Sequence, residues 1–230
     1  MAKVRFGTLA GQISGSIGST VFSHGRGGAY VRQRSIPVTH TSIPAMQIKA
    51  WFSASSVHWA TLGETVRLSW QEWAKANPYT DRLGEKRVLD GHAAYTMLCS
   101  RLLIMGGTYS TTPPVVPAPS ALLTLGLAAD IGAGTCGLVF TATPVPAATE
   151  MWVWAAVSDT ASQKYVRNRL RLVAHYPAAA ASPQLIKTEV EVRLGTLVVG
   201  QRLTVQVQMC STANGLISLP IRADASVIST

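Results

Sequence analysis

The second half of the chain alternates apolar and polar residues along seven short runs, and this pattern constrains the fold more than any other feature. A period of two places successive side chains on opposite faces of a β-strand. Glycine, proline, asparagine or aspartate separates one run from the next, as turns between strands require. The pattern therefore predicts seven strands in two packed sheets, at residues 121–127, 135–141, 151–157, 166–173, 186–194, 202–209 and 216–222.

Seven short strands in this length are typical of a β-sandwich of the immunoglobulin or fibronectin type III kind. In the run 166–173 the residues between the apolar ones are basic, and in 186–194 Glu189 and Glu191 alternate with valines. We expect these two charged rows to pair across one solvent-exposed face, and the alternative is an acidic partner surface for the arginines. The candidate contacts on this face are Arg167, Arg169 and Arg171.

A proline-rich segment interrupts the chain at residues 111–120, where four prolines fall within seven positions. Such a segment excludes helix and favours an extended spacer, so we place a domain boundary there. The sequence predicts an α+β protein in two parts, an N-terminal β-hairpin arm with a small helical unit, then an all-β sandwich. The expected regions are a basic glycine-rich arm at 1–42, a helical unit at 43–110, the linker at 111–120 and the sandwich at 121–230.

The arm is strongly basic, because residues 1–50 hold six Lys or Arg and no acidic residue within a chain of net charge +9. Residues 19–23 and 29–34 flank a glycine-rich turn and predict a β-hairpin. A hairpin alone is marginally stable and has unpaired edges, so we expect it to complete a sheet within the chain or in another subunit. The residues expected to contact an acidic protein or nucleic acid are Lys3, Arg5, Arg26, Arg32 and Arg34.

Three helices are predicted between about Ala45 and Gly107. Thr61 and Glu64 have the spacing of a capping box, and Asp90 is placed to cap the third helix. Four tryptophans occupy the inner stripes of the first two helices, which favours core packing over the alternative of stacking on nucleic acid bases. They are Trp51, Trp59, Trp70 and Trp73.

The sequence does not predict an enzyme, a metal or a cofactor. Residues 132–137 have the spacing G-x-G-x-x-G, but a strand rather than a helix is expected to follow, which contradicts a dinucleotide site. The five histidines are scattered, and Asp81, Glu85 and Asp90 alternate with basic residues. Three isolated cysteines indicate buried thiols in a reducing compartment, and glycines interrupt the one stretch that imitates a signal peptide or membrane segment.

The N-terminal part resembles uncharacterised phage and prophage proteins, over roughly residues 7–107. In those proteins a glycine-rich hairpin precedes short helices with Trp and Arg, and an immunoglobulin-like or fibronectin-like module often follows. The residues that carry the resemblance are Gly11, Gly15, Gly18, Val21, Phe22, Gly28, Tyr30, Val31, Arg32, Pro37, Gln47, Trp59, Leu62, Arg67 and Trp70. The resemblance implies a virion or prophage structural component and brings no catalytic residues.

We therefore expect a self-assembling structural component of a bacteriophage virion, with capsid shell or decoration favoured over tail or neck. Its expected partners are copies of itself, other virion proteins and packaged DNA, and no membrane. One alternative is a packaging protein that binds nucleic acid without sequence specificity, since a pI near 9.9 attracts phosphates. Another is an adhesion or carbohydrate-binding module, for which Trp152 and Trp154 on one strand face are the candidate aromatics, although core burial is favoured for both.

Overall fold

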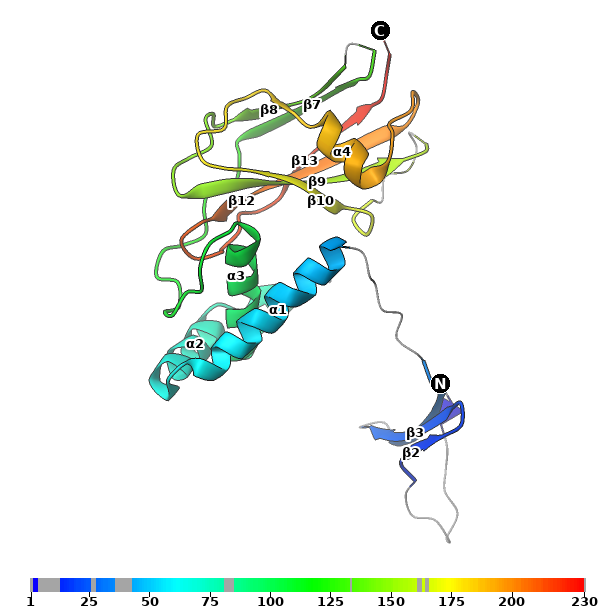
Figure 1. The fold of residues 1–230 in the computed structure, drawn as a ribbon, viewed down its shortest axis with the longest axis vertical. Helices are drawn as coiled ribbons and strands as arrows, with labels where there is room; N and C mark the ends of the chain where they lie inside the picture. The colour runs from blue at the N-terminus through cyan, green and yellow to red at the C-terminus, as the bar shows by residue number, and fades with distance from the viewer. Residues whose placement is uncertain are drawn as a thin grey trace. The chain divides into compact units, whose positions relative to one another are not determined.

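The computed structural model describes residues 2–3, 13–25, 28–35, 43–80, 85–132, 134–160, 163 and 166–229. The chain is a mixed α+β protein in which every sheet is antiparallel. It divides into two compact units, Met1–Met46 and Gln47–Thr230, which we call the arm and the body. Figure 1 shows the elements of each unit.

The arm is a four-stranded sheet in the order β1-β4-β3-β2. Strands β3 and β4 form the predicted hairpin, paired from Thr20↔Gln33 to Gly25↔Gly28. Gly18 has φ +58 in the tight turn between β2 and β3, a conformation that favours glycine. The short strands β1 and β2 extend the hairpin on its two sides, so the arm completes a small sheet from its own residues. The bounds are β1 Ala2–Lys3, β2 Gly15–Ile17, β3 Thr20–Gly25 and β4 Gly28–Gln33.

Three helices follow the arm sheet, as predicted, and the first of them begins at the end of the arm unit. Asp90 caps the third, since its carboxylate accepts a hydrogen bond from the His92 amide at 3.3 Å. Asn77 ends the second, and Gly106 with φ +75 follows the third. The helices are α1 Ile43–Thr61, α2 Glu64–Ala76 and α3 Gly91–Ile104, and a two-stranded ribbon of β5 Tyr79–Thr80 and β6 Lys86–Arg87 lies between α2 and α3.

The predicted capping box at Thr61 and Glu64 is wrong. Only Leu62 and Gly63 separate α1 from α2, so Thr61 still belongs to α1 and its hydroxyl donates to the His58 carbonyl at 2.7 Å. Gly63 is the N-cap of α2 and supplies no side-chain hydrogen bond.

The tryptophan-rich core of the helices is confirmed. Trp70, Tyr95, Leu98 and Cys99 are fully buried, and Trp59 and Trp73 are among the partly buried residues that pack against them. The rings of Trp70 and Tyr95 meet edge to face, with centroids 5.2 Å apart. The N-terminal half of the expected α1 stripe differs, because Ile48 is 46% exposed and Phe52 49%.

The reason lies in where α1 finds its partners. Ser56 and His58 in its C-terminal half bond to His92 and Tyr95 of α3. The apolar stripe is therefore covered only toward that end of the helix.

Two antiparallel sheets follow, with strand orders β11-β8-β7 and β10-β9-β12-β13 (Figure 1). Their facing side chains form one core, to which Leu138 and Phe140 contribute from the first sheet and Val153, Val205 and Val207 from the second. The strands are β7 Thr124–Asp130, β8 Thr135–Thr141, β9 Thr149–Ser158, β10 Arg171–Tyr176, β11 Gln184–Leu185, β12 Arg202–Ser211 and β13 Ile221–Ser226.

The strand predicted at 186–194 is wrong, because Lys187–Leu194 is a helix, α4. Ile186 and Val190 are fully buried, and their spacing of four residues suits one face of a helix as well as alternation suits a strand. Glu189 and Glu191 therefore lie on a helix and do not form a strand row opposite arginines.

The helices and the sheets belong to one unit, so the division predicted at 111–120 differs from the one observed. The loop between β12 and β13 reaches the helices, where the Gly215 carbonyl accepts from Arg101 Nη1 at 3.2 Å and Leu216 packs on the tryptophan cluster. Asn214 Nδ2 donates to the carbonyl of Val116 at 3.3 Å, which attaches the proline-rich segment itself.

Candidate functional site

The register of the arm sheet sorts its side chains onto two different faces. Residues that pair across strands share a face, and successive residues alternate. Phe22 pairs with Val31, and Thr20 with Ile17 and Gln33, so these residues share one face with His24. We call it the apolar face after Phe22, Val31 and Ile17. Tyr30 pairs with Ser23 and Arg32 with Val21, which places more polar and basic groups on the other face.

The described residues of the arm form no core under the apolar face. Among the arm residues whose exposure the structure describes, 13–24, 29–35 and 43–46, none is buried. Ile17 is 70% exposed although it belongs to a strand. Phe22 and Val31 on this face are partly buried, so the described residues of the arm cover the face only in part, and a partly open apolar face is typical of an interaction surface.

The predicted basic contacts of the arm are only partly described. Arg32 lies on β4, and Arg34 follows it with an exposed side chain and a backbone amide that donates to Ser19 O at 2.7 Å. Lys3 lies on β1 and pairs with Tyr30. Arg5 and Arg26 fall outside the described residues.

The three arginines predicted to form one strand row do not do so. Arg167 and Arg169 lie in a turn, and only Arg171 begins a strand, because β10 starts there rather than at residue 166. Arg169 donates to Gln163 Oε1 at 3.2 Å, and Arg171 donates to the carbonyls of Asn168 and Leu170. Arg167 alone of the three lines a cleft.

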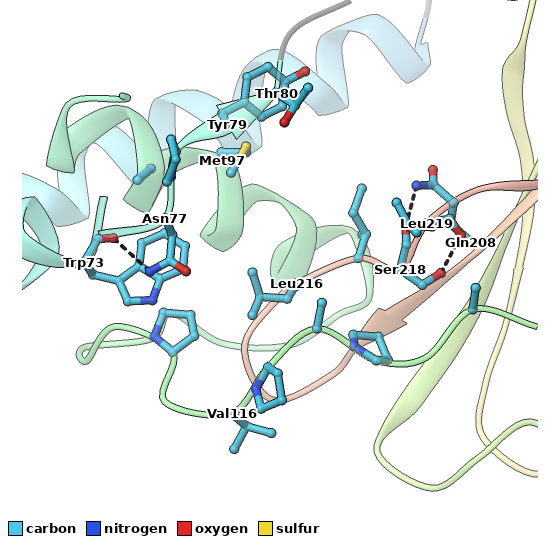
Figure 2. Close-up of a pocket in the computed structure, with 18 of the residues that line it drawn as sticks. Trp73, Asn77, Tyr79, Thr80, Met97, Val116, Gln208, Leu216, Ser218 and Leu219 are labelled. Carbon is cyan, nitrogen blue, oxygen red and sulfur yellow. Dashed lines mark hydrogen bonds between the residues drawn. The ribbon is translucent and has the colours of Figure 1, made fainter. Parts of the chain in front are cut away.

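A first cleft of about 940 Å³ lies in the body between the helices, the proline-rich segment and the connection from β12 to β13. Figure 2 shows Trp73 and Met97 on its helical side and Val116, Leu216 and Leu219 across from them. Most of these groups are apolar, and Leu219 is 79% exposed. The cleft is a place where apolar surface of the body meets solvent.

A second cleft of about 950 Å³ lies on the outer face of the sheet β10-β9-β12-β13. It has a different lining, in which aromatic rings, amides and guanidinium groups converge. Tyr79, Gln208 and Pro220 line both clefts, so the two adjoin. The remaining lining residues of the second cleft are Trp154, Arg167, Leu170, Gln206, Ile221 and Arg222.

The sequence analysis had named Trp154 and Arg167 separately, but it did not place them together. Met151, Val153 and Ala155 of β9 belong to the core between the sheets, so Trp152 and Trp154 point to the opposite face. Trp152 is only 4% exposed, which confirms its burial, whereas Trp154 is partly exposed in the cleft. The sequence analysis did not use the alternation of Gln206 and Gln208 with core valines on β12, which is the sequence signal that marks this face.

Buried titratable groups in the body have ordinary structural surroundings. His58 Nδ1 bonds the Tyr95 hydroxyl, whose pKa burial raises well above its usual range. The three cysteines are free and buried, as expected. Burial also raises the thiol pKa of each of them, and that of Cys210 to about 12. Such thiols stay protonated and are poor nucleophiles.

Two further expectations concern cofactors and membranes. The last three residues of the glycine-rich segment, 135–137, already belong to β8, so a strand rather than a helix continues from it, as predicted. In the described ranges no group of three or more His, Cys, Asp or Glu is placed to hold a metal ion. No described helix has the length and apolar character needed to cross a membrane.

No protein-family model and no curated protein match the chain. Among solved structures it is similar to a Fn3-like protein from Clostridium thermocellum, with 16% sequence identity and a TM-score of 0.29. The alignment covers 50% of this chain and 96% of that one.

Proposed function

We propose that this protein is a self-assembling structural component of a bacteriophage virion, in the capsid shell or its decoration rather than the tail or neck. The observation that carries the proposal is the arm, a four-stranded sheet whose apolar face its own described residues cover only in part. We assign the remaining cover to a second copy of the chain.

The stability of such a sheet depends on its partner. Small sheets need a covered hydrophobic face to be stable in water. Each Å² of apolar surface removed from water contributes about 25 cal/mol, so docking of Phe22, Val31 and Ile17 against another copy supplies what the arm lacks. Folding of the arm sheet is then coupled to assembly, because the sheet is stable only when it is docked on another copy.

The two faces suit two kinds of partner. Residues 1–50 contain no acid, so two arms repel through their basic groups and meet more favourably through their apolar faces. Arg32 and Arg34 stay exposed and suit an acidic neighbour, either another virion protein or packaged DNA. In this proposal the apolar face binds another copy of the chain, and the basic face gives the positive charge of the arm an acidic partner.

Two further features support a virion component. Residues 7–107 resemble phage and prophage proteins in their glycine-rich hairpin and their Trp and Arg helices. We also propose that the two-sheet part is an immunoglobulin or fibronectin type III-like module. Its first, second and fifth strands form one sheet and the other four form the second, and the two sheets share one core.

Light scattering on a sizing column tests the proposal, using nuclease-treated full-length protein at low and high salt. We expect a large discrete species that survives high salt. Phe22→Asp places a charge on the apolar face and should give the 24.4 kDa monomer. Ser23→Asp adds the same charge one residue along β3 on the other face and should still assemble.

Two outcomes contradict the proposal. One is a wild-type monomer at both salt concentrations, and the other is equal assembly of the two variants. A monomer that binds DNA only at low salt would favour the packaging function, for which exposed Arg32 and Arg34 are the specific observation. Absence of the protein from purified particles of the phage that encodes it would reject the virion assignment alone.

A further inference from the structure

The second cleft of the body is built on a regular row of side chains across its four-stranded sheet. Gln206 of β12 pairs with Trp154 of β9 on one side and with Arg222 of β13 on the other. Leu172 of β10 pairs with Trp154 and completes the row. Cross-strand partners lie on one face, so an apolar ring, an amide and a guanidinium stand side by side.

Hydrogen bonds hold the polar members of this row in fixed orientations. Arg222 Nε donates to Gln206 Oε1 at 2.9 Å, and Gln208 Nε2 donates to Ser218 O at 2.9 Å. Gln206 Nε2 approaches Gln208 Oε1 at 3.5 Å and links the two. Each amide keeps a second N–H and a second lone pair for a ligand, and Arg222 keeps the N–H groups of both terminal nitrogens.

The charge of the cleft has one sign. Arg167 and Arg222 line it, and no acidic residue among those that the structure describes does so. Asp224 follows Arg222 two residues along β13 and is near enough for the two charges to interact, but its carboxylate accepts its hydrogen bond from Arg202 Nη2 at 2.6 Å. Two guanidinium groups in a cleft without a lining carboxylate match an anionic ligand, since the planar fork binds carboxylate with two parallel hydrogen bonds.

The apolar part of the lining restricts the ligand further. Trp154, Tyr79 and Leu170 offer ring and aliphatic surface to a flat apolar group. The C–H face of a pyranose ring packs on such surface, while its hydroxyls need groups that both donate and accept, as the two glutamine amides do. Trp154 is inclined by 52° to its neighbour Trp152, so these two rings form no parallel slot for a nucleic acid base.

We propose that this cleft binds a saccharide that carries a carboxylate. Trp154 packs against the sugar ring, Gln206 and Gln208 bond its hydroxyls, and Arg222 with Arg167 binds the carboxylate. The adjoining first cleft, which shares Tyr79, Gln208 and Pro220, lets a chain of several sugars continue along the body. This site is independent of the arm and of assembly through it.

The test is a titration of the full-length protein, followed by calorimetry and tryptophan fluorescence. The probes are an α-1,4-linked galacturonic acid trimer, its methyl ester and a six-residue thymidine oligonucleotide. We expect the acid trimer to bind and the ester, which keeps rings and hydroxyls but lacks the charge, to bind at least about tenfold more weakly.

Variants locate the binding. Arg222→Gln and Arg167→Gln should each weaken the acid trimer about tenfold, whereas Arg193→Gln, an equal charge change on exposed α4, should leave it unchanged. Arg167 is exposed in a turn, so its variant tests the cleft even if Arg222→Gln alters the sheet. No binding at millimolar trimer, equal affinity for acid and ester, or equal loss in Arg193→Gln would overturn the proposal. Oligonucleotide binding that Arg222→Gln abolishes would reassign the cleft to nucleic acid.

Discussion

The arm and the body contain similar antiparallel strands, but among the described residues only those of the body give the strands a core. In the body, the strands β8, β9 and β12 bury Leu138, Val153 and Val205 between two sheets, all of them with no exposed surface. In the arm, the same alternation leaves Ile17 70% exposed. Alternation thus specifies the faces of a sheet, and a second layer decides whether those faces stabilise it.

This difference distinguishes the region that is stable by itself from the region that is available for interaction. A region that fills its own core can fold alone, whereas a region that presents a partly uncovered apolar face needs a partner. The six tryptophans all lie in the body, so their fluorescence reports the body alone. The comparison can therefore be tested one region at a time.

The largest expected effect comes from removing core volume in the body. Leu138→Ala should lower the free energy of unfolding by about 3 kcal/mol, because a fully buried leucine leaves a cavity. Ile17→Ala, the matched truncation in the arm, should change it by less than about 0.5 kcal/mol. Urea unfolding followed by tryptophan fluorescence measures both.

An equal loss in the two variants would contradict the comparison. It would mean that the arm and the body unfold as one cooperative unit and that Ile17 contributes to the stability of the whole chain.

Much of the fold could be predicted from the sequence wherever a local pattern was compatible with only one type of secondary structure. The hairpin β3–β4, the three helices and the cap at Asp90 are all specified by neighbouring residues. Prediction was wrong where two periods fitted the same residues. Ile186 and Val190 suit a helix and a strand equally, and contact with the core chose the helix α4.

The candidate sites needed the tertiary structure. The second cleft takes residues from β9, β12, β13, the turn at Arg167 and the ribbon residue Tyr79, which are far apart in the chain. Trp154 and Arg167 were recognised singly, but their meeting depends on strand order. The arm face was nearer to prediction, because the register of one hairpin suffices to place Phe22 beside Val31.

A smaller effect, from a substitution at Gly215, tests whether the helices and the sheets of the body fold together. Gly215 has φ +71, and a Cβ there would lie 2.6 Å from the carbonyl oxygen of Leu98 in α3. Gly215→Ala should therefore cost roughly 2 kcal/mol or more, through a left-handed backbone and a clash with fixed backbone. Thermal unfolding followed by fluorescence and circular dichroism measures it.

Gly106→Ala is the matched control, since Gly106 has φ +75 but open space around it. It should cost only about 1 kcal/mol for the backbone conformation. If both variants lose the same stability, the contact between α3 and the β12–β13 loop contributes little, and the helices and sheets behave as separate parts.

The smallest effect concerns acid, to which the two regions should respond differently. Burial acts to raise the pKa of Asp224, but hydrogen bonds from Thr204 and Arg202 and the nearby guanidinium charges lower it overall. A carboxyl whose folded pKa is depressed stabilises the fold above its unfolded pKa, near 3.9, and loses that contribution as the pH falls through the folded value.

Asp224→Asn should therefore narrow the stability difference between pH 7 and pH 2 by less than about 1 kcal/mol, because the pair is partly exposed. Residues 1–50 have no carboxylate side chain, so Asp224→Asn should leave the response of arm-mediated assembly to acid unchanged.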